Sequence, residues 1–374
     1  MIYLDHNATT PIEPAVTAAL LPYLGDSFGN PSSEHSYGAE PRAALDLARR
    51  ELAALLGAGN GHVIFTGSGS EADNLAIRGT VLAADAARPH VVTQVTEHPA
   101  VLRSCQALER WHGVEVTYLP VDSFGLVDPG DLEAAITSRT VLVSIMAANN
   151  ETGALQPLAD LVPAAHDRGV IFHSDAAQIL GKLPFDIDAL GIDLVTVAGH
   201  KMYAPKGVGA LFVRAGVQLE PLVYGGGQEY GVRAGTENVA LAVGLGVAAR
   251  LASEHLNDRH RIQKLRDTLQ DELTAELPGR VHVNGPLALR LPNTLNLSID
   301  GTTGADVLRN APGIAASTGS ACHSGDPEPS PVLTAMGLDR DRAFGAIRLS
   351  LGRSTTAEEI GAAIGQLAAA ARTV

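Results

Sequence analysis

The stretch Val195-Thr-Val-Ala-Gly-His-Lys201-Met-Tyr-Ala-Pro-Lys-Gly-Val-Gly209 leads from an apolar run through a Gly-His-Lys turn into a segment rich in glycine and proline. The apolar run predicts a buried strand, and the turn predicts where that strand ends. A second apolar run just upstream, Val170-Ile-Phe-His-Ser-Asp175, ends in a carboxylate. Both stretches therefore predict a strand with an ionisable side chain at its carboxyl end.

Strand-like and helix-like stretches alternate outward from these two runs. The predicted strands are 62–66, 90–93, 115–119, 140–146, 170–173, 194–198 and 210–214, and the predicted helices between them are 70–84, 98–112, 129–136 and 157–168. This alternation predicts an α/β fold with a mainly parallel central sheet and helices on both faces. In such sheets the active site gathers at the carboxyl ends of the strands.

From about Ala240 the pattern changes to a long helical region that ends near Leu277, before the helix-breaking pair Pro278-Gly279. Short strands at 281–283, 294–299 and 347–351 and helices at 305–310 and from 356 onward follow. We expect a smaller α+β domain here. The predicted division is 14–257 for the large domain, with 1–13 and 258–374 forming the small one.

The composition places the chain among globular proteins, with 374 residues, 45% hydrophobic and 18% charged, and a net charge of −14. The acidic balance argues against nucleic-acid binding. Val239–Ala252, the most apolar helical stretch, is shorter than the ~20 residues that a membrane span needs. We therefore expect no membrane partner. The start Met1-Ile-Tyr-Leu-Asp-His6 is unlike a signal peptide, and two distant cysteines imply no disulfide scaffold, so a cytoplasmic location is expected.

Lys201 and Asp175 together favour a specific chemistry. A pyridoxal phosphate cofactor needs an amine for a Schiff base and an anion beside its ring nitrogen. Lys201 alone would more often be an ordinary surface lysine after a strand. Paired with Asp175 at a second strand end, it becomes the predicted attachment point of pyridoxal 5'-phosphate.

Two helix starts supply further candidates. Phe65-Thr-Gly-Ser-Gly69-Ser70-Glu-Ala72 is a strand, a Gly/Ser turn and a helix start, where free amides and the Ser70 hydroxyl favour a phosphate. A Ser-capped helix after a flexible turn is the plainer alternative. His98, at the next helix start, suits stacking on a planar cofactor and proton transfer, although alone it would more often be an exposed histidine.

Two loops are rich in polar residues or glycine. Asn149-Asn150 follows the strand at 140–146 and suits hydrogen bonds to a ligand, but asparagine-rich turns are common. The loop Gly225-Gly-Gly-Gln-Glu-Tyr-Gly-Val-Arg233-Ala-Gly-Thr236 can bring its backbone close to a ligand or to another chain. Arg233 and Thr236 in this loop favour an anion over a mere linker.

Cys322 lies in the small, polar loop Ser317-Thr-Gly-Ser-Ala-Cys322-His-Ser-Gly-Asp-Pro-Glu-Pro-Ser330, which suggests a nucleophile. Cys105 lies in a helix-period stretch, and we interpret it as a small core or surface-helix residue. Arg348 lies on an apolar strand and needs an anionic partner, either a substrate carboxylate or an internal acid.

These strings together resemble the cysteine desulfurases, pyridoxal phosphate enzymes of fold type I, over essentially the whole chain. The resemblance begins with Tyr3-Leu-Asp-His-Asn-Ala-Thr-Thr-Pro11 and Gly29-Asn-Pro-Ser-Ser33 and ends with Arg348-Leu-Ser-Leu-Gly-Arg-Ser-Thr-Thr356. Several strings are also similar to selenocysteine lyases, namely Ala321-Cys-His-Ser324, Gly225-Gly-Gly-Gln-Glu229, Arg290-Leu-Pro-Asn-Thr294 and Gly352-Arg-Ser-Thr-Thr356.

The resemblance implies roles around the cofactor ring. Lys201 would hold the cofactor covalently, and Asp175 would keep its ring nitrogen protonated. Gln178 and Asn150 would bond the phenolic oxygen, and His98 would stack over the ring. No metal is implied.

The resemblance also implies roles at the two ends of the site. The phosphate would be held by the start of the helix and an imidazole, that is by Gly69, Ser70 and His200. Thr236 would reach the phosphate of a partner subunit, which implies a homodimer with shared active sites. Arg348 would clamp the substrate carboxylate, and Asn30 would also contact the substrate.

The implied reaction converts L-cysteine to L-alanine. Lys201, once displaced, would remove the Cα proton, and the Cys322 thiolate would take the substrate sulfur as a persulfide for an acceptor protein. Three features depart from the family pattern: Ala198 replaces a phosphate-binding serine, Gly67-Ser68 inverts the usual order, and we expect no scaffold-docking tail after the last helix. The alternatives are a selenocysteine lyase and a non-catalytic binding protein that keeps the cofactor fold.

Overall fold

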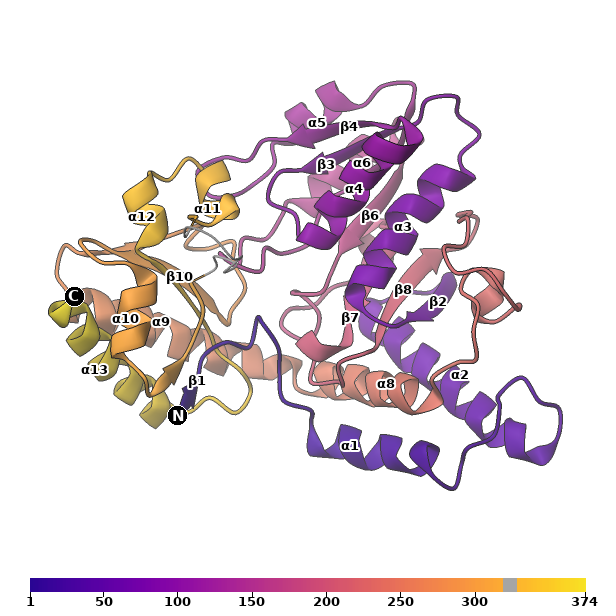
Figure 1. Ribbon diagram of the computed structural model, residues 1–374, viewed down its shortest axis with the longest axis horizontal. Helices are drawn as coiled ribbons and strands as arrows, with labels where there is room; N and C mark the ends of the chain where they lie inside the picture. Colours follow the sequence, from indigo (N-terminus) through magenta and orange to yellow (C-terminus); the bar gives the residue numbers. More distant parts are fainter. Residues whose placement is uncertain (319–327) are drawn as a thin grey trace.

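The computed structural model describes residues 1–318 and 328–374. Its largest sheet has seven strands and is covered by helices on both faces (Figure 1). The strand order is β2-β8-β7-β6-β5-β3-β4. β8 runs antiparallel to both of its neighbours, and the remaining pairs are parallel. The strands are β2 (Gly61–Thr66), β3 (His90–Gln94), β4 (Glu115–Leu119), β5 (Thr140–Ser144), β6 (Ile171–Asp175), β7 (Leu194–Ala198) and β8 (Gly209–Arg214).

Successive apolar residues of this sheet face opposite layers, as the pleat of a strand requires. In β5, Leu142 packs with one helix layer and Val143 with the other. The first layer contains α3 (Gly69–Ala83) and α4 (Pro99–His112). The second contains α1 (Pro14–Leu20), α2 (Ser36–Leu56), α5 (Pro129–Ala135), α6 (Leu158–His166), α7 (Ile187–Leu190) and α8 (Val239–Glu254). Burial on both faces explains why the strands are nearly continuous apolar runs.

A smaller antiparallel sheet lies beside the large one, with the order β12-β10-β9 (Figure 1). Its strands are β9 (Val281–Val283), β10 (Thr294–Ile299) and β12 (Ala346–Ser350). Helices α9 (Arg259–Glu276), α10 (Gly304–Asn310) and α13 (Ala357–Thr373) share its apolar core. Two short helices, α11 (Pro331–Ala335) and α12 (Arg340–Phe344), complete the described part of this region.

The first residues of the chain belong with the small sheet. β1 (Ile2–Tyr3) pairs with β11 (Ile314–Ala315), and Leu4 is buried in the core of the small sheet. Val16 of α1 already packs in the core of the large sheet. The domain division at 14–257 remains a prediction.

The α/β class and the mainly parallel sheet are confirmed, with element ends that shift by only a few residues. Five helices were not named from the sequence: α1, α2, α7, α11 and α12. α2 contains Pro41, which lacks a backbone N–H and normally interrupts a helix, yet its buried residues Leu45, Ala48, Leu52 and Leu56 follow helical spacing.

In the described residues, no helix by itself is long and apolar enough to cross a membrane; α8 with Leu256–Glu276 meets those criteria only across a 54° bend.

Candidate active site

A cavity of about 420 Å³ opens at the carboxyl ends of the large sheet. Its walls come from β6, β7 and the starts of α3 and α4, while Arg348 of β12 and the segment Asn7–Ala8 close it from the side of the small sheet. The predicted residues that line it are Gly69, Ser70, His98, Asn150, Asp175, Gln178, His200, Lys201 and Arg348. The structure thus brings these side chains together at the strand ends, as the strand-end rule predicts.

Lys201 ends a short 3-10 turn, Gly199–Lys201, directly after β7. Its Nζ donates to the backbone carbonyls of Asn7, at 2.6 Å, and Ala8, at 2.8 Å. Burial, reinforced by the positive charge of Arg348, lowers the pKa of Lys201 to about 8. About a tenth of this amine is thus uncharged at pH 7, far more than for an ordinary lysine, and the uncharged form is the nucleophile.

Asp175 is the last residue of β6 and is almost fully buried. Its Oδ1 accepts a hydrogen bond of 2.8 Å from the backbone N–H of Ala177. Burial raises the pKa of Asp175, while the Ala177 N–H, His98 and Lys201 oppose that rise. These three contacts favour the charged carboxylate and offset part of its burial cost, although burial remains the largest effect on the pKa of Asp175.

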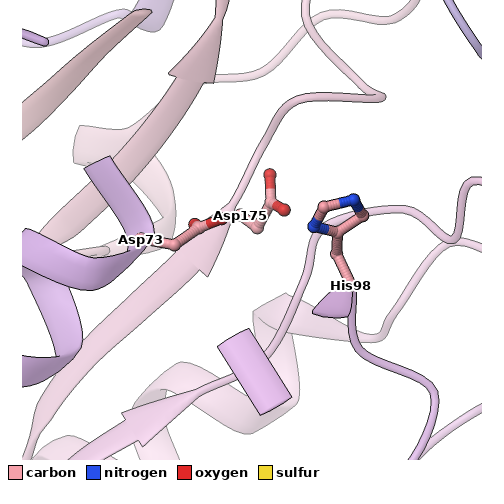
Figure 2. Close-up of side chains that lie close together, drawn as sticks. All are labelled: Asp73, His98 and Asp175. Carbon is pink, nitrogen blue, oxygen red and sulfur yellow. The ribbon is translucent and has the colours of Figure 1, made fainter. Parts of the chain in front are cut away.

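His98 caps the start of α4 and stands across from Asp175 (Figure 2). Its Nδ1 accepts from the backbone N–H of Ala100 at 3.2 Å, so the ring proton lies on Nε2. His98 is exposed to the open cavity, yet desolvation by the protein around it lowers the pKa of its imidazole, and Lys201 lowers it further against the opposing charge of Asp175. A neutral imidazole is therefore presented to the cavity.

Asp73 of α3 joins this pair, and the ligand atoms of Asp73, His98 and Asp175 all lie within 4.8 Å of one another (Figure 2). Such a group has the atoms that a cation could use. The same atoms line the cavity of Lys201, whose charge already faces Asp175. This position beside Lys201 favours a cofactor site over a cation site.

The start of α3 suits an anion. A Cβ on Gly69 would lie 2.9 Å from the Cβ of Ala198, so glycine is required for the close approach to β7. The first amides of a helix have no intrahelical acceptor, which leaves those of Gly69 and Ser70 available. Ser68 caps the helix by accepting from the Glu71 N–H at 3.1 Å, so the plainer interpretation of this turn is also correct.

Arg348 has an internal acidic partner. Its Nη2 donates to Asp5 at 2.7 Å, and its Nη1 donates to the backbone carbonyl of Asn150 at 3.1 Å. Its buried Nε has no hydrogen-bond partner in the described part of the chain. The Nε–H is thus available for a carboxylate, and the substrate role of Arg348 remains a prediction.

Three residues at the site were missed from the sequence: Asn7, Asp73 and Lys182. The Asn7 carbonyl accepts from Lys201 and, at 3.0 Å, from Gln178 Nε2. Lys182 donates to Gln178 Oε1 at 2.7 Å and to Asn7 Oδ1 at 3.2 Å, and burial lowers its pKa well below the usual value. The sequence did contain a signal for Asp73, because it follows Ser70 by three residues and therefore lies on the same face of the predicted helix.

Other predicted residues lie elsewhere. Asn30 and Thr236 are exposed and do not line the cavity of this single chain. Arg233, considered for an anion, donates to Glu71 of α3 at 2.8 Å. Cys322 lies outside the described residues. Cys105 is fully buried in α4, and burial raises the pKa of its thiol to about 12, which agrees with its interpretation as a core residue.

These residues fit pyridoxal phosphate. The cavity has the volume of a small-cofactor site. It offers a partly neutral amine, a buried carboxylate, a neutral imidazole and, at another wall, helix amides with His200. Burial lowers the pKa of His200 to about 4, and its Nδ1 lies 3.2 Å from Thr9 Oγ1.

Comparison with known proteins agrees with this fit. Residues 2–362 match the family described as aminotransferase class-V. The chain is 48% identical over 363 residues to the cysteine desulfurase of Nostoc sp., covering 96% of this chain and 90% of that protein. It is 44% identical over 362 residues to the cysteine desulfurase IscS of Dictyoglomus turgidum, covering 96% and 91%.

Solved structures extend the likeness to the fold. A NifS-like protein superposes with a TM-score of 0.92 at 34% identity and full coverage of both chains. The structure described as SspA in complex with cysteine gives a TM-score of 0.84 at 35% identity, covering 95% of this chain and 100% of that one. The fold is that of the fold type I pyridoxal phosphate enzymes, and the chain belongs to the cysteine desulfurase family of class-V aminotransferases.

Proposed function

We propose that this enzyme transfers the sulfur of L-cysteine to Cys322 as a persulfide and releases L-alanine. The observation that carries the proposal is the meeting of Lys201, Asp175 and Arg348 at one cavity. Lys201 comes from the large sheet and Arg348 from the small one, so an amino acid between them would be held at both its amine and carboxylate ends. Relatives named cysteine desulfurase support this substrate.

The chain's residues divide the work by position. Pyridoxal phosphate, when bound, supplies an electron sink for charge that develops at the substrate Cα. Lys201 moves the Cα proton with its Nζ, and Asp175 holds the proton of the ring nitrogen. Arg348 binds the substrate carboxylate, and His98 covers one face of the site. Gln178, fixed by Lys182 and the Asn7 carbonyl, would bond the phenolic oxygen of the cofactor together with Asn150.

Cys322 completes the transfer. Its thiolate attacks the substrate sulfur, so that an S–S bond forms while the Cβ–S bond breaks, and the electron pair of the broken bond returns to the substrate. Protonation of Cβ and return of a proton from Lys201 Nζ to Cα then yield alanine. Cys105 offers no competing thiolate, because burial raises its pKa to about 12.

The test uses the two cysteines as a matched pair. Cys322→Ser should keep the bound cofactor's absorbance but form no protein persulfide and release no alanine with L-cysteine. Cys105→Ser should behave as the wild type in both assays. Undiminished persulfide formation in Cys322→Ser would remove Cys322 from this role. Alanine release without any persulfide on the wild type would indicate a different sulfur fate.

L-selenocysteine should be run in the same assay. The likeness of four short strings to selenocysteine lyases is a prediction about substrate preference, and turnover confined to the selenium compound would replace the sulfur proposal.

Three further expectations complete the proposal. The exposed Thr236 would reach the phosphate of a second copy, making a homodimer with shared sites. The persulfide would pass to an acceptor protein, whose identity a labelled-sulfur transfer experiment would give. A reactive thiol suits a reducing compartment, so we infer a cytoplasmic location.

A further inference from the structure

Two buried carboxyl groups meet on the floor of the cavity, and the proposed function uses only one of them. Asp175 comes from β6 and Asp73 from α3, with side-chain atoms within 4.8 Å of each other and of His98. Figure 2 shows the Asp73 carboxyl reaching toward Asp175 from the side away from His98. Asp73 is 2% exposed, which is too buried for solvent to compensate a charge.

Among the described residues, no lysine or arginine forms an ion pair with Asp73. Its Oδ1 has no hydrogen-bond partner in the described part of the chain. His173 is the basic group within ion-pair range, with Nε2 3.8 Å away. Burial lowers the pKa of His173 to about 3, so this imidazole is neutral. A carboxylate here would be buried, half unbonded and unpaired, which is the costliest state for such a group.

Asp175 is better placed to keep the charge. It accepts from the Ala177 N–H and faces both His98 and Lys201. Two acids this close cannot both ionise cheaply, so the proton goes to the one with less compensation. Burial first, and then the charge of Asp175, raise the pKa of Asp73 well above its usual value. Glu97, the other acid facing Asp73, is itself buried, which raises its pKa to about 8.

A continuous polar chain leads away from Asp73. The Thr196 side chain lies beside its carboxyl, and this contact lowers the pKa of Asp73 by less than burial and the charge of Asp175 raise it. Thr196 Oγ1 lies 3.1 Å from His173 Nε2, and His173 Nδ1 lies 2.8 Å from Ser144 Oγ. Hydroxyls and a neutral imidazole each donate once and accept, so the protons of this chain can point either way. A neutral carboxyl can donate into the chain, and the burial of Asp73 without an ion pair is what favours that form over a carboxylate.

We propose that Asp73 is a positioning residue that acts as a neutral carboxylic acid: it completes the chain Thr196–His173–Ser144 and leaves the negative charge of the cavity floor on Asp175. Asp73 thereby supports Asp175 without competing with it for the ring-nitrogen proton. This inference rests on the proposed role of Asp175 toward the cofactor.

The test compares four variants of the holoenzyme without substrate. Asp73→Asn keeps the shape, neutrality and hydrogen bonding of an acid, whereas Asp73→Ala removes them. Asp175→Asn removes the proposed charge, and Asp193→Asn is a control in the same sheet, away from the cavity. The readouts are the absorbance of the bound cofactor across pH and the dissociation constant for pyridoxal phosphate.

We expect Asp73→Asn to keep the absorbance titration midpoint and to change the dissociation constant by no more than about twofold. Asp73→Ala should weaken cofactor binding about tenfold, since Thr196 loses its partner. If Asp73 were charged, Asp73→Asn would instead move the midpoint by about one unit or more. That shift would overturn the proposal, and Asp73→Asn decides the matter alone if Asp73→Ala does not fold.

Infrared difference spectroscopy between the wild type and Asp73→Asn provides a direct check. The wild type should show the C=O stretch of a protonated carboxyl that the variant lacks, and absence of that band would contradict the proposal. Asp175→Asn separates the two levels of inference. If Asp175→Asn changes the cofactor spectrum and Asp73→Asn shifts the titration midpoint, only the role of Asp73 is overturned. An unchanged spectrum in Asp175→Asn removes the role of Asp175 and this inference with it.

Discussion

The two ends of the strand pair β6–β7 carry similar ionisable side chains, but these side chains differ in how many hydrogen-bond and ion-pair partners they have. At the carboxyl end, Lys201 hydrogen-bonds only to backbone carbonyls among the described residues, and Asp73 keeps an unbonded carboxyl oxygen. At the amino end, Asp193 accepts from the Phe172 N–H at 2.8 Å and lies 2.9 Å from His166 Nε2. Arg214 adds its charge to Asp193 at 3.7 Å.

The difference separates function from stability within one sheet. The amino end satisfies its charges internally, so it has little capacity left for a ligand. The carboxyl end leaves an amine, an acid and the Arg348 Nε incompletely satisfied, which raises its folding cost and makes it ready for a bound group. Substitutions at the two ends should therefore affect different properties.

Lys201→Ala should have the largest effect. Removing the amine removes covalent attachment of the cofactor and proton transfer at Cα, so turnover should fall by roughly 10⁴-fold. Alanine release and the absorbance of the holoenzyme measure both losses. Turnover within tenfold of the wild type would show that the carboxyl end does not depend on this amine.

Asp175→Asn should come next, with turnover reduced by about 10²–10³-fold, because a preorganised charge is lost where the reaction needs it. The circular dichroism spectrum should be unchanged, since the amide can still accept from Ala177. Full activity in the variant would mean that the buried carboxylate is structural, like Asp193.

The pH dependence of the apoprotein gives a smaller effect. Because the pKa of Lys201 is lowered to about 8, the rate at which this amine captures added pyridoxal phosphate should rise with a midpoint near pH 8. Capture at pH 7 should be about tenfold slower than at the plateau. Stopped-flow absorbance measures this rate, and a midpoint near the ordinary lysine pKa would contradict the environment described.

Ionisation of the Lys201 amine also makes the stability of the apoprotein depend on pH. The pKa of Lys201 is about 8 in the folded state and 10.5 in the unfolded state. At pH values below 8, burying the charged ammonium therefore lowers the free energy of unfolding by its full amount. That cost disappears as the pH rises from about 8 toward the unfolded pKa, since the unfolded chain then binds more protons. Lys201→Met in the apoprotein should remove this part of the pH dependence.

Asp193→Asn should have the smallest effect on turnover, with none expected, and a stability loss of about 1–2 kcal/mol because charged hydrogen bonds become neutral ones. Urea denaturation measures the loss. A marked fall in turnover at wild-type stability would break the distinction between the two ends of the strands.

The sequence predicted those parts of the site that follow from local pattern. Asp175 and Lys201 end or follow apolar strands, and the strand-end rule brings them together without knowledge of the fold. Arg348 was identified as needing an anion, but its pairing with Asp5 spans 343 residues and depends on the packing of the small sheet. Asn7 was missed because it contacts Lys201 and Gln178 through its backbone carbonyl, and a backbone carbonyl gives no signal in the sequence.

The connection of the first residues to the last strand has a consequence for biosynthesis. Asn7 donates its backbone N–H to Ser350 Oγ at 2.9 Å, and the Ser350 N–H donates to Leu4 at 2.8 Å. The carbonyls that hold the Lys201 amine therefore reach their final places only after the ribosome has released almost the entire polypeptide. A nascent or C-terminally truncated chain could form the large sheet and still lack a complete binding site for its cofactor.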